Sequence, residues 1–254
     1  KTIYQNAYVR TDSYFDNSPL ASSGLPSKNE LELLNVWKDE IPAEVFTETF
    51  TPPITDGSGN DRKNLLKAKE ILEKEGWFVE NGKLVKDGKE FKFEFLIVSP
   101  SDEKIALAYQ SNLKKLGITM DVRTVDSSQY QERLLSYDFD MIKRYWGVSL
   151  SPGNEQQFYW GSEVGQKDGS RNYPGINSPA VDALIEKLIS ATNREELTTA
   201  IHALDRVLLW GHYVVPLYHS NKDRIAYWDF FEYPDEIPLY GIVIESWWIN
   251  KDKQ

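Results

Sequence analysis

The sequence predicts an α/β fold in which helices flank a largely parallel or mixed sheet. From residue 61 onward, segments with the apolar spacing of helices alternate with short segments that have the pattern of strands. Glycine, asparagine and aspartate residues typical of turns separate these segments. No internal repeat and no low-complexity segment interrupts the order. Such alternation is typical of helices packed on a sheet.

The segment before residue 61 carries one clear helix signal. Residues 1–26 have little periodicity and end in serines, a glycine and a proline, so we expect a loop. Ser27 and Glu30 form the Ser-x-x-Glu pattern of a capping box, and leucines follow at 31, 33 and 34. A short helix should therefore begin here. Residues 51–60 are turn residues almost throughout.

The later elements follow from periodicity and turn residues. A helix over 61–75 should end at Gly76, because glycine readily adopts the left-handed conformation that follows a helix. Alternating phenylalanines at 91, 93 and 95 predict a strand that becomes fully buried at 96–98. The expected order is a helix over 61–75, strands over 77–80, 83–85 and 91–98, a helix over 101–116, a strand over 118–125, a helix over 127–137, a strand over 141–147, a loop over 148–178, helices over about 179–190 and 193–210, and a strand over 214–218.

Composition and charge exclude several classes of function. The chain has 254 residues, with 39 acidic and 29 basic side chains and a net charge of -10. Such a chain repels phosphate backbones, so nucleic acid is not an expected partner. The absence of cysteine excludes disulfide scaffolds, cysteine nucleophiles and thiolate metal sites. The longest apolar run covers only residues 105–109, whereas a membrane-spanning helix needs roughly 20.

The start of the sequence is unusual. The chain starts at Lys1, its only methionines are Met120 and Met141, and no signal peptide is recognisable. We therefore expect this chain to be a piece of a longer or processed protein.

Catalytic and metal-binding motifs are scarce. The histidines at 202, 212 and 219 lack the spacing of metal ligands, and no nucleophile elbow or phosphate-binding loop is present. Asp138 and Asp140 are more typical of a solvated strand entry than of acid–base chemistry. The sequence thus predicts no metal, no cofactor and no catalytic residue.

The most informative stretch covers residues 143–172. It directly follows a predicted strand, so it should leave the carboxyl edge of the sheet, where α/β proteins usually bind ligands. It combines aromatic side chains with amides, which suits a peptide or a sugar better than a single ion. The alternative is an ordinary surface loop whose aromatic side chains fold back onto the core.

Three blocks carry a family resemblance: LLKAKEILEKEGW (65–77), NLKKLGITMDVRTVDSSQYQERLLSYDFDMI (112–142) and SPAVDALIEKLISATNREELTTAIHALDRVLLWGHYVVPLY (178–218). They resemble the C-terminal half of extracellular solute-binding proteins of the peptide/nickel type, family 5, which are receptors of ABC importers. The segments at 10–27, 151–162, 169–172 and 208–218 resemble more narrowly the Yej-type branch, which takes up oligopeptides and, in some bacteria, antibiotics of the microcin C kind.

The resemblance implies the second lobe of a two-lobed periplasmic-binding-protein fold (type II, cluster C). Residues 1–220 would form this lobe, incomplete at its N-terminus, and residues 221–254 would return to a first lobe that is absent from this chain. Trp228, Tyr240, Trp247 and Trp248 would pack on that first lobe. The implied function is to capture oligopeptides in the periplasm of a Gram-negative cell and deliver them to an inner-membrane ABC permease, without catalysis. The first lobe would belong to the same polypeptide, or to a separate piece if the parent chain has been cut.

Site residues carry over position by position. The family's cleft tryptophan falls on Trp146 and its basic residue on Lys143, but on an ideal strand Arg144 shares the face of Trp146 and is the one we favour. Many relatives hold the peptide's amino terminus with an aspartate where this chain has Ser149. Either Glu155 replaces that aspartate, or the ligand's N-terminus is blocked or differently placed. The expected ligand-binding set is Arg144, Tyr145, Trp146, Ser149, Asn154, Glu155, Tyr159, Arg171 and Asn172.

One other class remains open on the sequence. A carbohydrate-active hydrolase or a sugar-binding module would also use an acidic and aromatic loop over 146–172. A hydrolase needs two carboxylates about 5–10 Å apart in one cleft. Glu155 and Glu163 are the nearby candidates on the loop.

Overall fold

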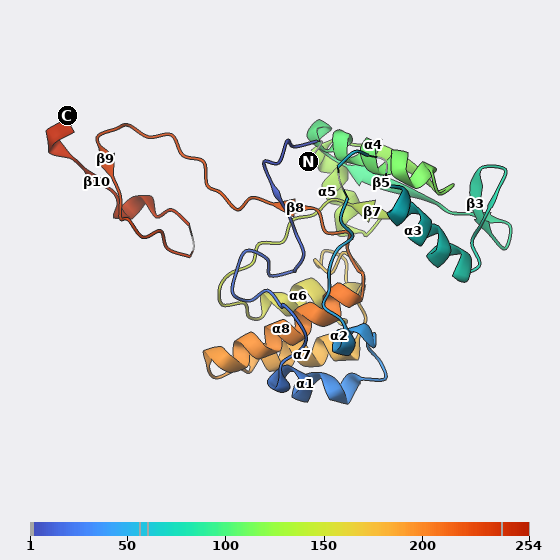
Figure 1. Cartoon of the computed structure of the whole chain (residues 1–254), viewed down its shortest axis with the longest axis horizontal. Helices are drawn as coiled ribbons and strands as arrows, with labels where there is room; N and C mark the ends of the chain where they lie inside the picture. The colour runs from blue at the N-terminus through green and yellow to red at the C-terminus, as the bar shows by residue number, and fades with distance from the viewer. Residues whose placement is uncertain (1–2, 56, 60, 240, 254) are drawn as a thin grey trace.

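The computed structural model describes residues 3–55, 57–59, 61–239 and 241–253. Figure 1 shows a helical part with α1, α2 and α6–α8, a sheet part with α3–α5, and a C-terminal tail that extends away from both. The helices are α1 Lys28–Leu34, α2 Glu44–Thr47, α3 Arg62–Lys74, α4 Pro100–Lys114, α5 Ser127–Leu135, α6 Glu155–Trp160, α7 Pro179–Ile189 and α8 Arg194–Trp210, with 3-10 turns at Asn35–Trp37, Val164–Gln166, Ile244–Ser246 and Lys251–Lys253.

The sheet part contains a parallel sheet of order β6-β5-β7. Its strands are β5 Lys92–Ile97, β6 Thr119–Thr124 and β7 Met141–Ile142, and β5 lies in the centre with Phe95, Leu96 and Ile97 buried. A second sheet is the antiparallel meander β2 Phe78–Glu80, β3 Lys83–Lys86 and β4 Lys89–Glu90. The predicted α/β class with parallel and mixed pairing is confirmed.

Tight turns fix the meander and join it to the parallel sheet. Asn81 and Gly82 have φ of 50° and 81°, the left-handed pair of a two-residue hairpin turn predicted from the Asn-Gly sequence. The carbonyl of Gly117, at the end of α4, accepts the backbone N–H of Leu84 at 2.7 Å. Gly117 has φ of 80°, and a Cβ added there would lie 2.7 Å from the Leu84 nitrogen. Only glycine satisfies both constraints.

Consecutive charged residues of α8 hold the N-terminal segment in place. Asp205 is fully buried, and its carboxylate accepts the Ser13 hydroxyl and the Tyr14 N–H, each at 2.8 Å. It also accepts the Ser22 N–H at 2.9 Å and the Ser22 hydroxyl at 2.7 Å. Burial raises the pKa of Asp205, and these donors oppose the shift.

Arg206 makes a second set of contacts with the same segment. Its Nε donates to Glu30 at 2.6 Å, and its terminal nitrogens donate to the carbonyls of Gly24 at 2.7 Å and Ser23 at 2.8 Å. Glu30 also completes the predicted capping box with Ser27. Residues 13–24 of the expected loop are thus held by a helix far along the sequence.

Three predicted elements differ from the structure. The strand expected over 141–147 is limited to β7, which pairs with only two residues of β5. Beside it, the Asp140 carboxylate accepts a hydrogen bond from the backbone N–H of Glu94 at 2.8 Å. The loop expected over 148–178 contains α6, where Trp160 Nε1 donates to Gln156 Oε1 at 3.0 Å. The strand expected over 214–218 is wrong: the strand is β8 Tyr218–His219, and it forms only because β1 Val9–Arg10 pairs with it.

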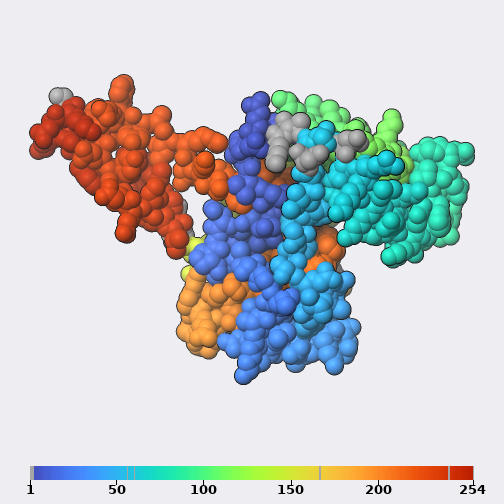
Figure 2. All heavy atoms as spheres, viewed as in Figure 1, coloured from blue at the N-terminus to red at the C-terminus, as the bar shows by residue number. Residues whose placement is uncertain are grey.

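The tail beyond residue 220 projects from the body in Figures 1 and 2. It contains the antiparallel strands β9 Phe231–Glu232 and β10 Trp248–Ile249. Trp228 is 73% exposed, whereas Trp247 packs on Tyr227 and Tyr233. Tyr240 lies outside the described residues. The assignment of this tail to another lobe stays a prediction.

Candidate functional site

The candidate site lies where the helical part meets the sheet part. Parallel strands end at the same edge of their sheet, and the chain leaves β7 at that edge through Lys143 and Arg144. The ring of Tyr173 packs with the small core beneath α5, and the ring of Trp160 packs in the core of the helical part. Trp146 lies between these two rings, 5.1 Å from Trp160 and 6.3 Å from Tyr173 between centroids.

The neighbouring cations Lys143 and Arg144 differ in their surroundings. The Lys143 ammonium pairs with Asp102 in the first turn of α4 and lies 5.9 Å from the centre of the Tyr218 ring. The Tyr218 hydroxyl in turn donates to Tyr4 at 3.0 Å, and burial and this contact raise the pKa of Tyr4 to about 12. Lys143 is therefore neutralised within the lobe.

Arg144 has no such counter-ion. Its guanidinium lies over the Tyr173 ring at 4.7 Å, and none of the ion pairs found among the described residues includes it. Its Nε is buried without a hydrogen-bond partner in the part of the chain that the structure describes. Burial raises the pKa of Tyr130, and the nearby Arg144 opposes that shift. Arg144 is thus a partly buried cation that forms no ion pair with a carboxylate of the described residues.

Trp146 lies on the same face as Arg144, and like Arg144 it has a buried donor without a hydrogen-bond partner among the described residues. Both side chains contact Tyr173, as expected for residues two apart on an extended segment. The indole Nε1 of Trp146 is also buried without a partner among the described side chains and backbone. We call Tyr14, Trp146, Trp160 and Tyr173 the aromatic cluster. Tyr14 joins it edge-on against Trp160 at 5.0 Å, and burial raises the pKa of its hydroxyl.

The remaining expected residues are spread along the loop. Tyr145 is 86% exposed, and Ser149, Asn154 and Arg171 are exposed as well. The Glu155 carboxylate accepts the Gly153 N–H at 2.9 and 3.0 Å, so it is occupied within the loop. Tyr159 is half-buried against the helical core.

The side chain of Asn172 is held inside the loop, and its expected contact with a ligand stays a prediction. Its side chain is completely buried, and its amide donates to the carbonyls of Gly161 at 3.0 Å and Ile176 at 2.8 Å. Its side-chain oxygen accepts the Ile176 N–H at 2.9 Å. Asn172 therefore ties the loop together, because both of its amide hydrogens are used internally.

The sequence did not single out Tyr14 or Tyr173. Tyr173 directly follows the 169–172 segment, and its aromatic side chain was the available signal. Tyr14 reaches the cluster only through the contacts of its segment with α8, which no local pattern reveals.

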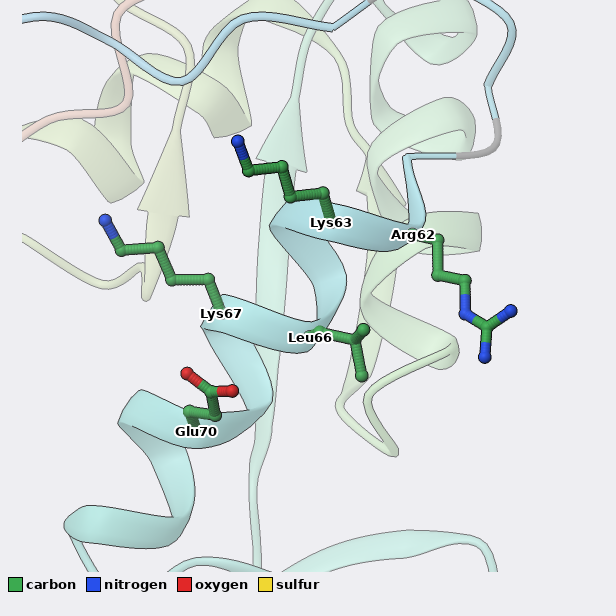
Figure 3. Close-up of a pocket in the computed structure, with 5 residues that line it drawn as sticks. All are labelled: Arg62, Lys63, Leu66, Lys67 and Glu70. Carbon is green, nitrogen blue, oxygen red and sulfur yellow. The ribbon is translucent and has the colours of Figure 1, made fainter.

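A shallow hollow elsewhere on the surface does not belong to this site. It lies on the outer face of α3 and is lined by Arg62, Lys63, Leu66, Lys67 and Glu70. Figure 3 shows Lys63 and Lys67 extending in the same direction from the helix, while Arg62 and Leu66 extend to its other side. Ligand pockets are usually enclosed clefts or cavities, whereas this hollow is wide open to solvent. In the described ranges, no group of three histidine, aspartate or glutamate side chains could hold a metal.

Residues 1–168 match the family of bacterial extracellular solute-binding proteins, family 5 Middle. The chain belongs to this family. This membership confirms the resemblance found in the sequence. No helix of the described residues combines the length and apolar character needed to cross a membrane.

Two curated relatives align with almost the entire chain. An uncharacterized protein, y4wM, of Sinorhizobium fredii is 49% identical over 251 residues, which cover 98% of this chain and 38% of the relative. A probable peptide-binding protein, YejA, of Agrobacterium fabrum is 42% identical over 254 residues, which cover 99% of this chain and 41% of the relative. The chain therefore spans about two fifths of the length of these two relatives.

A solved structure shows the shared fold. The oligopeptide-binding protein AppA of Bacillus subtilis, solved with a nonapeptide, aligns with a TM-score of 0.57 at 22% identity. The alignment covers 88% of this chain and 45% of AppA. The expected fold, one lobe of a periplasmic-binding-protein architecture with a mixed sheet flanked by helices, is confirmed.

Proposed function

We propose that the protein containing this chain is the substrate-binding receptor of an ABC importer and captures oligopeptides in a cleft between two lobes. In this proposal it works in the periplasm and delivers its ligand to an inner-membrane permease. The observation that carries the proposal is the aromatic cluster at the carboxyl edge of the sheet. In this chain, which belongs to family 5, the cluster lies beside the unpaired donors of Arg144 and Trp146. Aromatic faces provide contact area at little entropic cost, and unused donors can meet peptide carbonyls.

The exposed tail supports a two-lobed receptor. Leu239 is 79% exposed and Ile244 is 69% exposed, in addition to Trp228. Contiguous exposed apolar surface usually marks an interaction site. In this proposal the tail packs on the first lobe, and the lobe described here supplies only one face of the cleft.

A hydrolase is the less favourable interpretation. The Glu163 side chain pairs with Lys167 at 2.7 Å, and this contact lowers the pKa of Glu163. A general acid needs a raised pKa instead. Glu155 is held by the Gly153 backbone, as described above. The relative from Agrobacterium fabrum is named as a binding protein and not as an enzyme.

The position of Ser149 bears on how a peptide's N-terminus is treated. Ser149 is exposed, and its hydroxyl accepts the Ser151 N–H at 3.2 Å. A hydroxyl does not compensate an ammonium as a carboxylate does, so a free amine should gain little here. We expect formylated peptides to bind at least as well as peptides with a free amine. Calorimetry on matched pairs tests this, and a strong preference for the free amine would point to Glu155 as its partner.

Ligand binding to the full-length protein tests the proposed function. A thermal-shift panel would contain di- to hexapeptides, peptide–nucleotide conjugates of the microcin C kind, oligosaccharides and nickel complexes. A ligand that binds only the folded state raises the melting temperature, so peptides and their nucleotide conjugates should raise it, and oligosaccharides and nickel complexes should not. The isolated 254-residue chain should bind the same peptides far more weakly. A response to sugars alone would overturn the proposal.

A further inference from the structure

The outer face of α3 is a positively charged surface in an acidic chain. Residues 61–92, which contain α3 and the meander, have nine basic and seven acidic side chains, whereas the whole chain has 29 basic and 39 acidic ones. Because a helix turns by about 100° per residue, one half of α3 carries five exposed charged residues, which we call the basic face: Arg62, Lys63, Lys67, Glu70 and Lys74. Four cations thus lie at the surface with one anion among them.

The charge of the basic face is not neutralised within the lobe. None of its four cations takes part in an ion pair among the described residues, whereas Lys69, which lies outside the face, pairs with Glu73 at 3.5 Å. Lys63 and Lys67 lie one turn apart and extend in the same direction from the helix (Figure 3). These cations are therefore available to an anionic partner.

Apolar side chains are exposed beside the basic face. Leu66 and Ile71 belong to α3 and are exposed. Ile54 is 81% exposed, and its carbonyl accepts a hydrogen bond from the Asn64 side chain at 3.2 Å, which holds Ile54 at the first turn of α3. Basic side chains with exposed apolar residues beside them are typical of helices that lie on an anionic membrane surface.

The chemistry of the basic face favours a lipid surface over a protein partner. Protein interfaces are depleted in lysine and enriched in aromatic residues, whereas this face has three lysines and no aromatic residue. The hollow on α3 is wide open, so it encloses no single anionic group. A bilayer needs no pocket, because flexible lysine side chains can reach several headgroups at once.

We propose that the basic face of α3 binds the surface of an anionic phospholipid membrane. The ammonium and guanidinium groups pair with headgroup phosphates, and Ile54 and Leu66 enter between the headgroups. At physiological salt, charges farther than about 8 Å from the membrane are largely screened, so the local face outweighs the net charge of -10. This contact involves no peptide and is therefore independent of the proposed function.

Co-sedimentation of the full-length protein with lipid vesicles tests the proposal. The probes are vesicles of phosphatidylglycerol and, as the neutral reference, of phosphatidylcholine. We expect the binding constant to be at least about tenfold higher for phosphatidylglycerol, and this difference to disappear at high salt. One basic residue near an anionic surface changes the binding constant about fivefold, so Lys63→Gln combined with Lys67→Gln should weaken binding at least about tenfold.

Two further variants assign the effect to this face. Glu70→Gln removes its one anion and should strengthen binding about two- to fivefold. Lys28→Gln combined with Lys187→Gln changes the net charge as much as the double variant of α3 does, but at exposed positions of α1 and α7 in the helical part. This control should leave binding within about twofold. Melting curves verify that each variant is folded.

Lysine acetylation shows whether the rest of the protein covers the basic face. Lys63 and Lys67 should react in the free full-length protein and become protected when phosphatidylglycerol vesicles are added. Protection without vesicles would mean that another part of the protein covers α3, and it would overturn the proposal. Equal binding to both lipids, or an equal loss in the control variant, would overturn it as well. Each of these outcomes leaves the proposed peptide receptor standing.

Discussion

Replacing Asp205 should release the N-terminal segment from α8 and loosen the wall of the candidate site. The Asp205 carboxylate accepts the backbone N–H groups of Tyr14 and Ser22 and the hydroxyls of Ser13 and Ser22. In Asp205→Ala the hydroxyls can turn to other acceptors, but the two backbone donors cannot. Each hydrogen bond to a charged group contributes about 1.5–3 kcal/mol, and removing a buried carboxylate relieves part of its desolvation. We expect a net loss of about 3 kcal/mol in the stability of this segment.

Native-state hydrogen exchange measures this loss locally. A loss of about 3 kcal/mol corresponds to roughly a hundredfold faster exchange of amides that open with this segment. The amides of 13–22 should therefore respond strongly and those of α4 little, because α4 belongs to a separate hydrophobic cluster. Glu186→Ala, on an exposed position of α7, is the control of equal charge. Less than about threefold acceleration in 13–22 would show that Asp205 does not hold the segment.

Three further predictions concern the site and the two parts of the fold. Trp146→Ala should weaken peptide binding to the full-length protein by about 1–3 kcal/mol in calorimetry, and an unchanged affinity with intact folding would make Trp146 purely structural. Gly117→Ala should lower the melting temperature clearly more than Gly88→Ala, because both have positive φ but only at Gly117 would the Cβ meet backbone, at 2.7 Å. Equal decreases in melting temperature for the two variants would show that the close approach of the backbone at Gly117 is not the reason for glycine there. Arg206→Met should lower the free energy of unfolding by about 3–5 kcal/mol, because it removes the ion-pair partner of Glu30. Adding Glu30→Gln should restore part of that loss. Strictly additive effects in a double-mutant cycle measured by chemical denaturation would refute the coupling.

Local signals in the sequence predicted most elements of the sheet part. The Asp61 side chain caps α3, and Gly76, with φ of 82°, ends it as the sequence indicates. The Asn81-Gly82 turn and the Asp87-Gly88 turn both adopt left-handed conformations. These features depend on neighbouring residues, and for that reason one sequence is sufficient to find them. The family motifs are also local blocks, and the membership that they indicated is confirmed.

The sequence by itself thus determined the fold class, the family, and the stretch in which Arg144 and Trp146 lie. Only the tertiary structure decided that β7 stops at Ile142 and that β8 needs β1 as its partner. It also decided that Asn172 is internal and that Asp102 neutralises Lys143. These outcomes depend on contacts between distant residues, such as Ser13 with Asp205, 192 positions apart. Burial and charge compensation arise from such non-local contacts, and no local pattern of residues encodes them.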